Sequence, residues 1–143
     1  MERNYRRNMK NELNSLADSI AKRLIANGFT VQRYNAYTTN SIYLKLDYGV
    51  CNSIRISDHP GKKYLKYRYN IGSFVKEYRK EKDRFDRFYY RADKSKNMIK
   101  KIIEDREAKK SRYGEDGYIR LMQKSKSENA GTLGFWSKAV LLN

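Results

Sequence analysis

Residues 41–47 read Ser-Ile-Tyr-Leu-Lys-Leu-Asp, and this alternation of apolar and polar side chains decides the fold. Successive side chains of a β-strand point to opposite faces, so the segment predicts a strand that buries Ile42, Leu44 and Leu46. β-Branched and aromatic residues alternate in the same way in three further segments, residues 29–34, 53–57 and 63–71. Because the connections are short and contain turn-forming residues, we expect an antiparallel sheet of three or four strands.

The segment before the sheet predicts an amphipathic helix. Between Asn11 and Asn27 the apolar residues recur at steps of three and four, which places them on one face of a helix. Gly28 follows and can adopt the left-handed conformation that ends many helices. We expect this helix to pack on one face of the sheet, against the inward side chains of Ile42, Leu44, Leu46, Ile54, Ile56, Leu65 and Ile71.

The chain after the sheet predicts a second, basic helix. Ser73 can cap a helix that begins near Phe74 and runs to about Arg112, either unbroken or with a break near residues 93–95. The apolar C-terminal segment, residues 131–143, is expected to dock on the body of the protein. The predicted fold class is α+β, with a flexible basic arm at residues 1–10, a helix-and-sheet core at residues 11–73, and a helical C-terminal part of the same domain at residues 74–143.

The net charge indicates the class of partner. The 143 residues include 32 Lys and Arg against 16 Asp and Glu, which gives a formal net charge of +16. A surplus of this size attracts polyanions and accelerates their association. The chain also has 13 tyrosines, and a tyrosine ring can stack on an unpaired base while its hydroxyl stays in water. We therefore expect a nucleic acid, RNA more than DNA, or a ribonucleoprotein as the partner.

Two groups of residues are predicted to bind nucleic acid. The first is the outer face of the sheet, where the residues between the buried ones are cations and tyrosines: Tyr43, Lys45, Arg55, Tyr64, Lys66 and Arg68. The second follows the Pro60-Gly61 turn and the second helix: Lys62, Lys63, Lys76, Arg79, Lys80, Arg84, Arg87 and Arg91. Two alternatives stay open, because the helix or the C-terminal segment can cover the sheet face, and a run of charges can be an ordinary solvated surface.

Few residues of the chain suit catalysis or metal binding. Cys51 is the only cysteine and His59 the only histidine, so the sequence offers no set of Cys and His ligands. It contains no phosphate-binding glycine loop and no nucleophile motif. We expect a protein without enzymatic activity, metal or cofactor, although His59 beside Asp58 leaves a metal-free ribonuclease open. The polar N-terminal residues and the lack of a long apolar run predict a location in the cytoplasm of a bacterial host cell.

Residues 24–31, Leu-Ile-Ala-Asn-Gly-Phe-Thr-Val, and the later residues 59–62, His-Pro-Gly-Lys, resemble the HicA-type toxins. These toxins are small ribonucleases with a fold like that of double-stranded-RNA-binding modules, and the resemblance covers residues 11–73. It implies a helix on an antiparallel sheet and an affinity for RNA. The family's catalytic histidine falls between the first two strands, where residues 35–40 of this chain contain no histidine, so the resemblance does not extend to the chemistry.

Residues 53–59, Ser-Ile-Arg-Ile-Ser-Asp-His, resemble a strand of the small basic anti-CRISPR proteins that phages encode. Such proteins act on type II CRISPR nucleases. The basic, tyrosine-rich start of the chain and its Lys-rich later helix are similar as well. The resemblance implies a protein of phage or mobile-element origin that binds a CRISPR nuclease–guide RNA complex. The net charge of +16 excludes the acidic DNA mimicry of many other anti-CRISPR proteins.

The leading hypothesis is thus a non-enzymatic nucleic-acid-binding protein that inhibits a CRISPR ribonucleoprotein. There are two alternatives. One is a HicA-like ribonuclease that uses His59, and the other is a DNA-binding regulator that places the second helix in the major groove.

Overall fold

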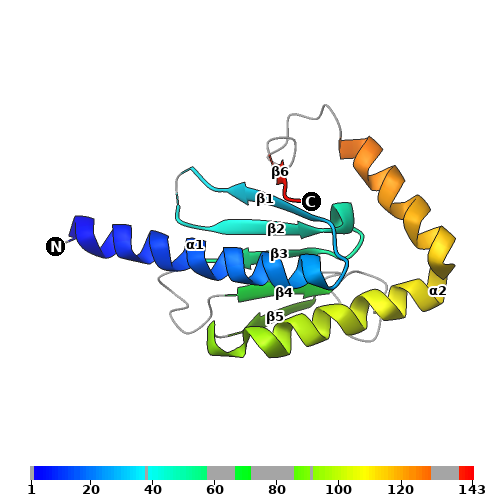
Figure 1. Cartoon of the computed structure of the whole chain (residues 1–143), viewed down its shortest axis with the longest axis horizontal. Helices are drawn as coiled ribbons and strands as arrows, with labels where there is room; N and C mark the ends of the chain where they lie inside the picture. Colours follow the sequence, from blue (N-terminus) through cyan, green and yellow to red (C-terminus); the bar gives the residue numbers. More distant parts are fainter. Residues whose placement is uncertain (1, 38, 58–66, 72–85, 91, 130–138) are drawn as a thin grey trace.

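The computed structural model describes residues 2–37, 39–57, 67–71, 86–90, 92–129 and 139–143, with the backbone alone for residues 2–9, 67–71, 86–89, 92 and 129. Figure 1 shows a single sheet with helix α1 (Glu2–Ala26) lying across it and the long helix α2 (Ser95–Asn129) bending around its end. The strands are β1 (Val31–Asn35), β2 (Ile42–Leu46), β3 (Ser53–Ile56), β4 (Tyr67–Ile71), β5 (Asp86–Tyr90) and β6 (Val140–Leu141). Two short 3-10 helices, η1 (Asp47–Gly49) and η4 (Ala92–Lys94), follow β2 and β5.

The strands form one antiparallel sheet in the order β5-β4-β3-β2-β1-β6. Strands that are consecutive from β1 to β5 are neighbours in the sheet, as the short predicted connections indicate. Strands β1 to β4 lie within or close to the four alternating segments of the sequence. The α+β fold class is therefore confirmed. The sheet is larger than the three or four strands expected, because β5 and β6 extend its two edges.

Helix α1 ends as its sequence predicts. Gly28 has a φ of +86°, a conformation that residues with a Cβ rarely adopt. Its backbone N–H donates to the Ile25 carbonyl at 2.9 Å. The N–H of Phe29 donates to the Leu24 carbonyl at 3.1 Å. These two bonds make a Schellman cap, which closes the helix and directs the chain into β1.

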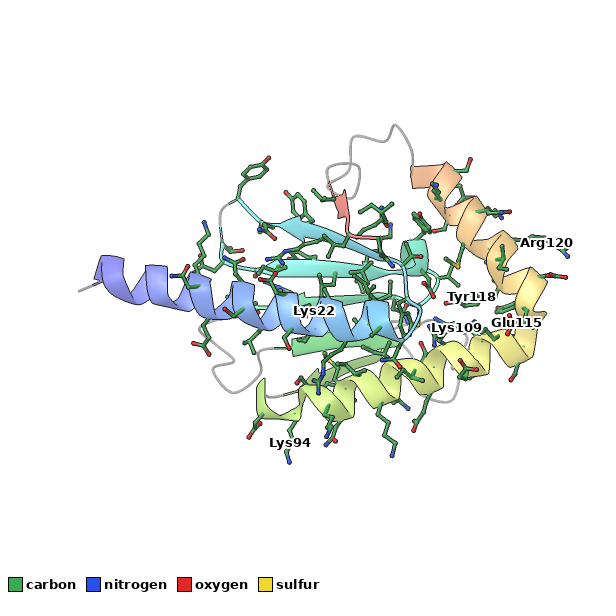
Figure 2. All side chains as sticks on the ribbon, in the orientation of Figure 1. Lys22, Lys94, Lys109, Glu115, Tyr118 and Arg120 are labelled. Carbon is green, nitrogen blue, oxygen red and sulfur yellow. The ribbon has the colours of Figure 1, made fainter. Side chains whose placement is uncertain are left out.

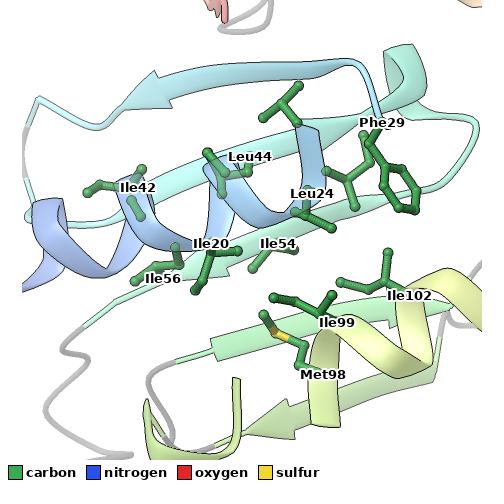
Figure 3. Packing of buried hydrophobic residues seen from close by; sticks show 14 of the residues in the cluster. Ile20, Leu24, Phe29, Ile42, Leu44, Ile54, Ile56, Met98, Ile99 and Ile102 are labelled. Atoms are coloured by element: carbon green, nitrogen blue, oxygen red, sulfur yellow. The ribbon is translucent and has the colours of Figure 1, made fainter. Parts of the chain in front are cut away.

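The hydrophobic core lies between one face of the sheet and both helices, as Figure 3 shows. Ile20 and Leu24 of α1 and Ile102 of α2 pack in the same cluster as the inward side chains of β2 and β3. The predicted inward residues of these two strands are confirmed, since each is at most 2% exposed: Ile42, Leu44, Leu46, Ile54 and Ile56. For the other two predicted inward residues, Leu65 and Ile71, the structure describes no side chain. Helix α1 and the first part of α2 thus occupy one side of the sheet.

Residues 2–10, predicted as a flexible arm, are the first turns of α1. The segment contains neither Gly nor Pro, and its Glu, Arg, Lys and Met residues have high helix propensity. Extending a helix that already packs on a sheet costs much less than nucleating one. The predicted helix from Asn11 therefore continues towards the N-terminus as far as Glu2.

Strand β5 replaces part of the predicted second helix. Residues 86–90, placed within that helix by the sequence pattern, pair with β4 from Ile71 opposite Asp86 to Tyr67 opposite Tyr90. The segment is rich in aromatic residues, which favour strands. Apolar residues in so short a basic stretch fit a strand as well as a helix, and the pairing with β4 decides between the two.

Helix α2 begins and ends later than predicted. It starts at Ser95, where the sequence allowed a break, and not near Phe74. It passes the predicted end at Arg112 through a kink at Gly114, whose φ is 75° and ψ is 162°. The kink lets the helix change direction at the end of the sheet and continue to Asn129 (Figure 1). No described helix has an apolar stretch long enough to cross a membrane.

The C-terminal residues add a short edge strand to β1. Leu142 donates its N–H to the Val31 carbonyl at 2.9 Å, and the N–H of Val31 donates to the Asn143 side-chain oxygen at 2.9 Å. Val140 and Leu141 are 63% and 46% exposed. Backbone pairing therefore holds this end on the sheet, whereas docking through apolar side chains is not confirmed. The earlier part of the predicted apolar segment lies outside the described residues.

Replacing Ile102 with Ala should destabilise the fold by about 2–5 kcal/mol, because Ile102 is 0% exposed in the core and the change leaves a cavity. Ile119→Ala is a matched control on the same helix, where Ile119 is 49% exposed, and should change stability by at most about 0.5 kcal/mol. Urea denaturation followed by circular dichroism measures both values. Equal losses in the two variants would contradict the packing of α2 described above.

Candidate nucleic-acid interface

The outer face of the sheet is the face opposite the core. The register places a row of residues across β1 to β5 on this face, each opposite the next: Tyr34, Tyr43, Arg55, Arg68 and Tyr89. Residues directly opposite one another on neighbouring strands share a face of the sheet. The positions beside the row on the same face are Gln32, Lys45, Ser53, Asn70 and Arg87. None of these ten positions is acidic.

Three tyrosines gather where the row begins. The ring centroids of Tyr34 and Tyr43 are 6.3 Å apart with the planes tilted by 43°. Those of Tyr34 and Tyr37 are 6.4 Å apart with the planes at 80°. Tyr37 is 83% exposed, whereas Tyr34 and Tyr43 are half-buried. The rings therefore meet by edges and tilted faces and do not stack on one another.

Arg55 lies next to these tyrosines. Its guanidinium carbon is 5.8 Å from the centroid of the Tyr43 ring, within the range of a cation–π contact. One of its terminal nitrogens lies 3.4 Å from the Ser41 hydroxyl, and its Nε has no hydrogen-bond partner among the described residues. The Nε is buried, so the donors of Arg55 that a phosphate could reach are those of its terminal nitrogens.

Lys45 corrects the predicted surface. It occupies an outer-face position, but it is only 8% exposed. Its Cε lies beside Gly49, where any Cβ would come within 2.8 Å, and the Ser125 hydroxyl of α2 reaches the same place. Burial lowers the pKa of the Lys45 ammonium below its ordinary value. Because Lys45 stands near the end of β2, its side chain packs over η1 and supports that corner of the sheet.

The structure brings five of the predicted binding residues together on the outer face. Tyr43, Lys45 and Arg55 lie there with their side chains described, and Arg68 and Arg87 occupy backbone positions on the same face. Arg87 was predicted on a helix, and that assignment is wrong because β5 carries it. The remaining predicted residues lie outside the described part of the chain: Lys62, Lys63, Tyr64, Lys66, Lys76, Arg79, Lys80, Arg84 and Arg91.

Sequence reasoning missed three tyrosines of this region. Tyr34 alternates with Val31 and Arg33 in the predicted first strand, and that pattern already placed it on the face opposite Val31. Tyr89 lies within the predicted second helix, and only pairing with β4 places it in the row. Tyr37 lies in the connection between β1 and β2, where no periodicity indicates a direction.

Exposed cations on the helices are mixed with acids. Figure 2 labels three of the exposed cations: Lys22 on α1, Lys94 at the end of η4 just before α2, and Arg120 on α2. The same helices carry exposed acids: Glu12, Asp18, Glu104, Glu107, Glu115, Asp116 and Glu128. Opposite charges on one helical surface weaken its field, which matches the alternative of an ordinary solvated surface for the helices. Among the described elements, the outer face of the sheet carries positive charge without acids.

A buried polar corner holds the end of β2 beside this face. Asp47 and Tyr48 have positive φ values of 50° and 56°. The Asp47 carboxylate accepts hydrogen bonds from the Thr30 N–H at 2.9 Å and from the Tyr118 hydroxyl. The Ser125 hydroxyl donates to the Tyr48 carbonyl. Figure 2 shows Tyr118 on the inner side of the bend of α2, so these bonds tie the second half of α2 to the left-handed corner.

A second buried polar group lies on α2 before the bend. Lys109 and Asp105 form an ion pair of 3.4 Å, and both side chains are 5% exposed. The Lys109 ammonium also donates to the Val50 carbonyl at 2.6 Å. Cys51 is fully buried, with its sulfur 4.0 Å from a carboxylate oxygen of Asp105. These contacts connect α2 to the segment after η1, and their burial keeps them away from a dissolved substrate.

No three residues among the described His, Cys, Asp and Glu gather where they could hold a metal ion. His59, on which the ribonuclease alternative depends, lies outside the described residues.

No family model, no curated protein and no solved structure matches the chain. The resemblances to HicA-type toxins and to anti-CRISPR proteins stay predictions.

Replacing Tyr118 with Phe should destabilise the fold by about 1–3 kcal/mol at neutral pH, because it removes a donor from the buried Asp47 carboxylate. Burial, with Cys51 and Asp47 nearby, raises the pKa of Tyr118 above its ordinary value of 10.0. The folded protein then keeps a proton that the unfolded chain loses, so stability from this group falls as the pH rises above about 10. The Phe variant lacks this loss.

Chemical denaturation at pH 7 and between about pH 9 and 11 tests both effects. Tyr113→Phe is the matched control, since Tyr113 lies on the same helix and is 45% exposed. A Tyr118→Phe variant with wild-type stability and a wild-type pH profile would show that the bond to Asp47 does not hold α2.

Proposed function

We propose that this chain is a non-enzymatic protein that binds nucleic acid through the outer face of its sheet. The observation that carries the proposal is the row of tyrosines and arginines across β1 to β5, in which Tyr34 adjoins Tyr43 and Tyr43 adjoins Arg55. Arginine binds phosphate with several donors, while tyrosine stacks on bases or packs on riboses. A row that combines these two chemistries suits a chain that carries both phosphates and bases.

The charge of the chain supports this proposal. A net charge of +16 raises the local concentration of any polyanion. The outer face is where a polyanion would be drawn, since its positions include Arg55, Arg68 and Arg87 and no acid. Phosphate contacts supply affinity that falls with salt and carry little sequence information. We therefore expect binding that depends strongly on ionic strength and weakly on sequence.

The proposal contains no reaction step. A general acid or base has to reach the proton that it transfers. Among the described groups that could serve in this way, Asp47, Asp105 and Tyr118 are buried and paired with protein groups, and none of the exposed acids occupies one of the ten outer-face positions. Their arrangement supports a role in packing, and the outer face itself offers arginine and tyrosine, which suit binding.

As the target, we propose a type II CRISPR nuclease with its guide RNA. The support is the resemblance of residues 53–59 to a strand of basic anti-CRISPR proteins. The described part of that motif is β3, which lies inside the sheet between β2 and β4. Its arginine is Arg55, in the middle of the outer-face row. The motif therefore coincides with the surface proposed to hold nucleic acid.

Replacing Arg55 with Gln should weaken binding to RNA and reduce its salt dependence. The logarithm of affinity falls with the logarithm of salt concentration, and loss of one phosphate contact should make this negative slope shallower by about 0.7. Arg120→Gln is the matched control, because it removes the same charge from an exposed position on α2 (Figure 2). Fluorescence anisotropy with a labelled RNA over a salt series measures both slopes. Equal slopes for the wild type and Arg55→Gln would reject the outer face as the binding surface.

The proposed target has a separate test. The wild-type protein should suppress DNA cleavage by a type II CRISPR nuclease loaded with guide RNA, and Arg55→Gln should suppress it less at the same concentration, because it holds the guide less tightly. Gel analysis of the cleaved DNA measures both. Full cleavage at a large excess of the wild type would discard this target while leaving the RNA-binding proposal intact.

A further inference from the structure

We infer that the outer face binds unpaired bases, with Tyr37, Tyr34 and Tyr43 forming a stacking platform that continues into Arg55. This inference rests on the proposed function and names the form of nucleic acid that the same surface selects. The ligand is a single-stranded segment of RNA or DNA, recognised through the faces of its bases as well as through its phosphates.

Exposure of Tyr37 is the first observation. A large ring that is 83% exposed contributes little to the core, so packing does not explain its position. It lies 6.4 Å from Tyr34, edge towards face, and Tyr34 in turn lies 6.3 Å from Tyr43. The exposed ring is therefore the end of a continuous aromatic line that leads onto the sheet. Every base has a flat π-face, so such a line accepts bases with little regard to sequence.

The spacing of the tyrosine rings indicates whether they fit paired or unpaired bases. In a duplex, successive bases follow at about 3.4 Å along each strand, and each base is covered on both faces by its neighbours. Steps of 6.4 Å and 6.3 Å with planes at 80° and 43° do not match that regular stack. A single strand can splay its bases so that each meets a ring in its own orientation. The geometry thus favours an unstacked strand over a helix.

Arg55 adds a positive charge at the end of the line of tyrosines. Its guanidinium stands 5.8 Å from the Tyr43 ring, on the side of Tyr43 away from Tyr34 in the order of strands. A strand with its bases on the three tyrosines would bring backbone phosphates to Arg55 and to the positions of Arg68 and Arg87. Tyrosines then select unpaired bases, while the arginines supply the part of the affinity that salt weakens.

The test uses the full chain and four labelled probes of about 12 nucleotides or base pairs: oligo-uridine, oligo-thymidine, an abasic strand with the same phosphates, and a duplex. Fluorescence anisotropy at low salt measures each Kd. We expect both single strands to bind more tightly than the abasic strand and the duplex. Tyr37→Leu should raise the Kd for the single strands by about 5-fold or more and leave the Kd for the abasic strand unchanged.

Two control variants separate stacking from folding. Tyr37→Phe keeps the aromatic ring and should stay within about 2-fold of the wild type. Tyr113→Leu removes an exposed tyrosine from α2 and should bind as the wild type does. Circular dichroism checks that each variant is folded. A lower Kd for either single strand, with both below the Kd of the abasic strand, would support the inference and show whether the RNA or the DNA probe is preferred.

The two proposals fail in different ways. Equal binding of the single strands, the abasic strand and the duplex, unchanged by Tyr37→Leu, would overturn the stacking platform and leave a surface that holds phosphates alone. Absence of binding to all four probes at low salt would overturn nucleic-acid binding itself, and the platform with it.

Discussion

Burial of a single face of the sheet is the constraint on which the rest of the structure depends. Ile42, Leu44 and Ile54 are at most 2% exposed beneath the two helices, and each buried methylene contributes about 0.8 kcal/mol. A shift of any strand by one residue would move its apolar set to the other face, so this burial fixes the register. The same register decides what stands on the outer face. Tyr43 and Arg55 are neighbours there because the residues on either side of each of them are buried.

The parts of the fold that could be predicted are those with a strong local signal. Strands β1 to β4 have clear alternation, and the end of α1 at Gly28 follows from the conformational freedom of glycine. Strand β5 lacks such a signal, because its residues fit two periodicities and only pairing with β4 selects the strand. Strand β6 pairs with residues more than a hundred positions earlier, and no local pattern encodes a partner at that distance.

For the candidate site, the face of the sheet on which a residue lies was predictable, but its contacts were not. Alternation placed Tyr43 and Arg55 on one face, and the structure puts the Arg55 guanidinium beside the Tyr43 ring. Alternation predicts to which face of the sheet a side chain points, but it does not predict what surrounds that side chain. For this reason Lys45 was expected in solvent, whereas it is buried over η1. The kink of α2 at Gly114 brings Ser125 to that corner, and a contact between such distant segments depends on the assembled fold. The line of tyrosines also depends on the assembled fold, because Tyr37 lies in the connection between β1 and β2, whereas Tyr34 and Tyr43 lie on those two strands.

Pairing of the C-terminal residues with β1 also affects how the molecule behaves at high concentration. The outer edge of a sheet exposes backbone donors and acceptors that can recruit a strand from another molecule. Here Leu142 and the side-chain amide of Asn143 satisfy the carbonyl and the N–H of Val31, and the Asn143 amide also donates to the Phe29 carbonyl at 2.8 Å. A side chain thus takes the place of a continuing strand. The edge of the sheet passes to β6, which is only two residues long, and so short an edge strand offers little backbone for another molecule to pair with.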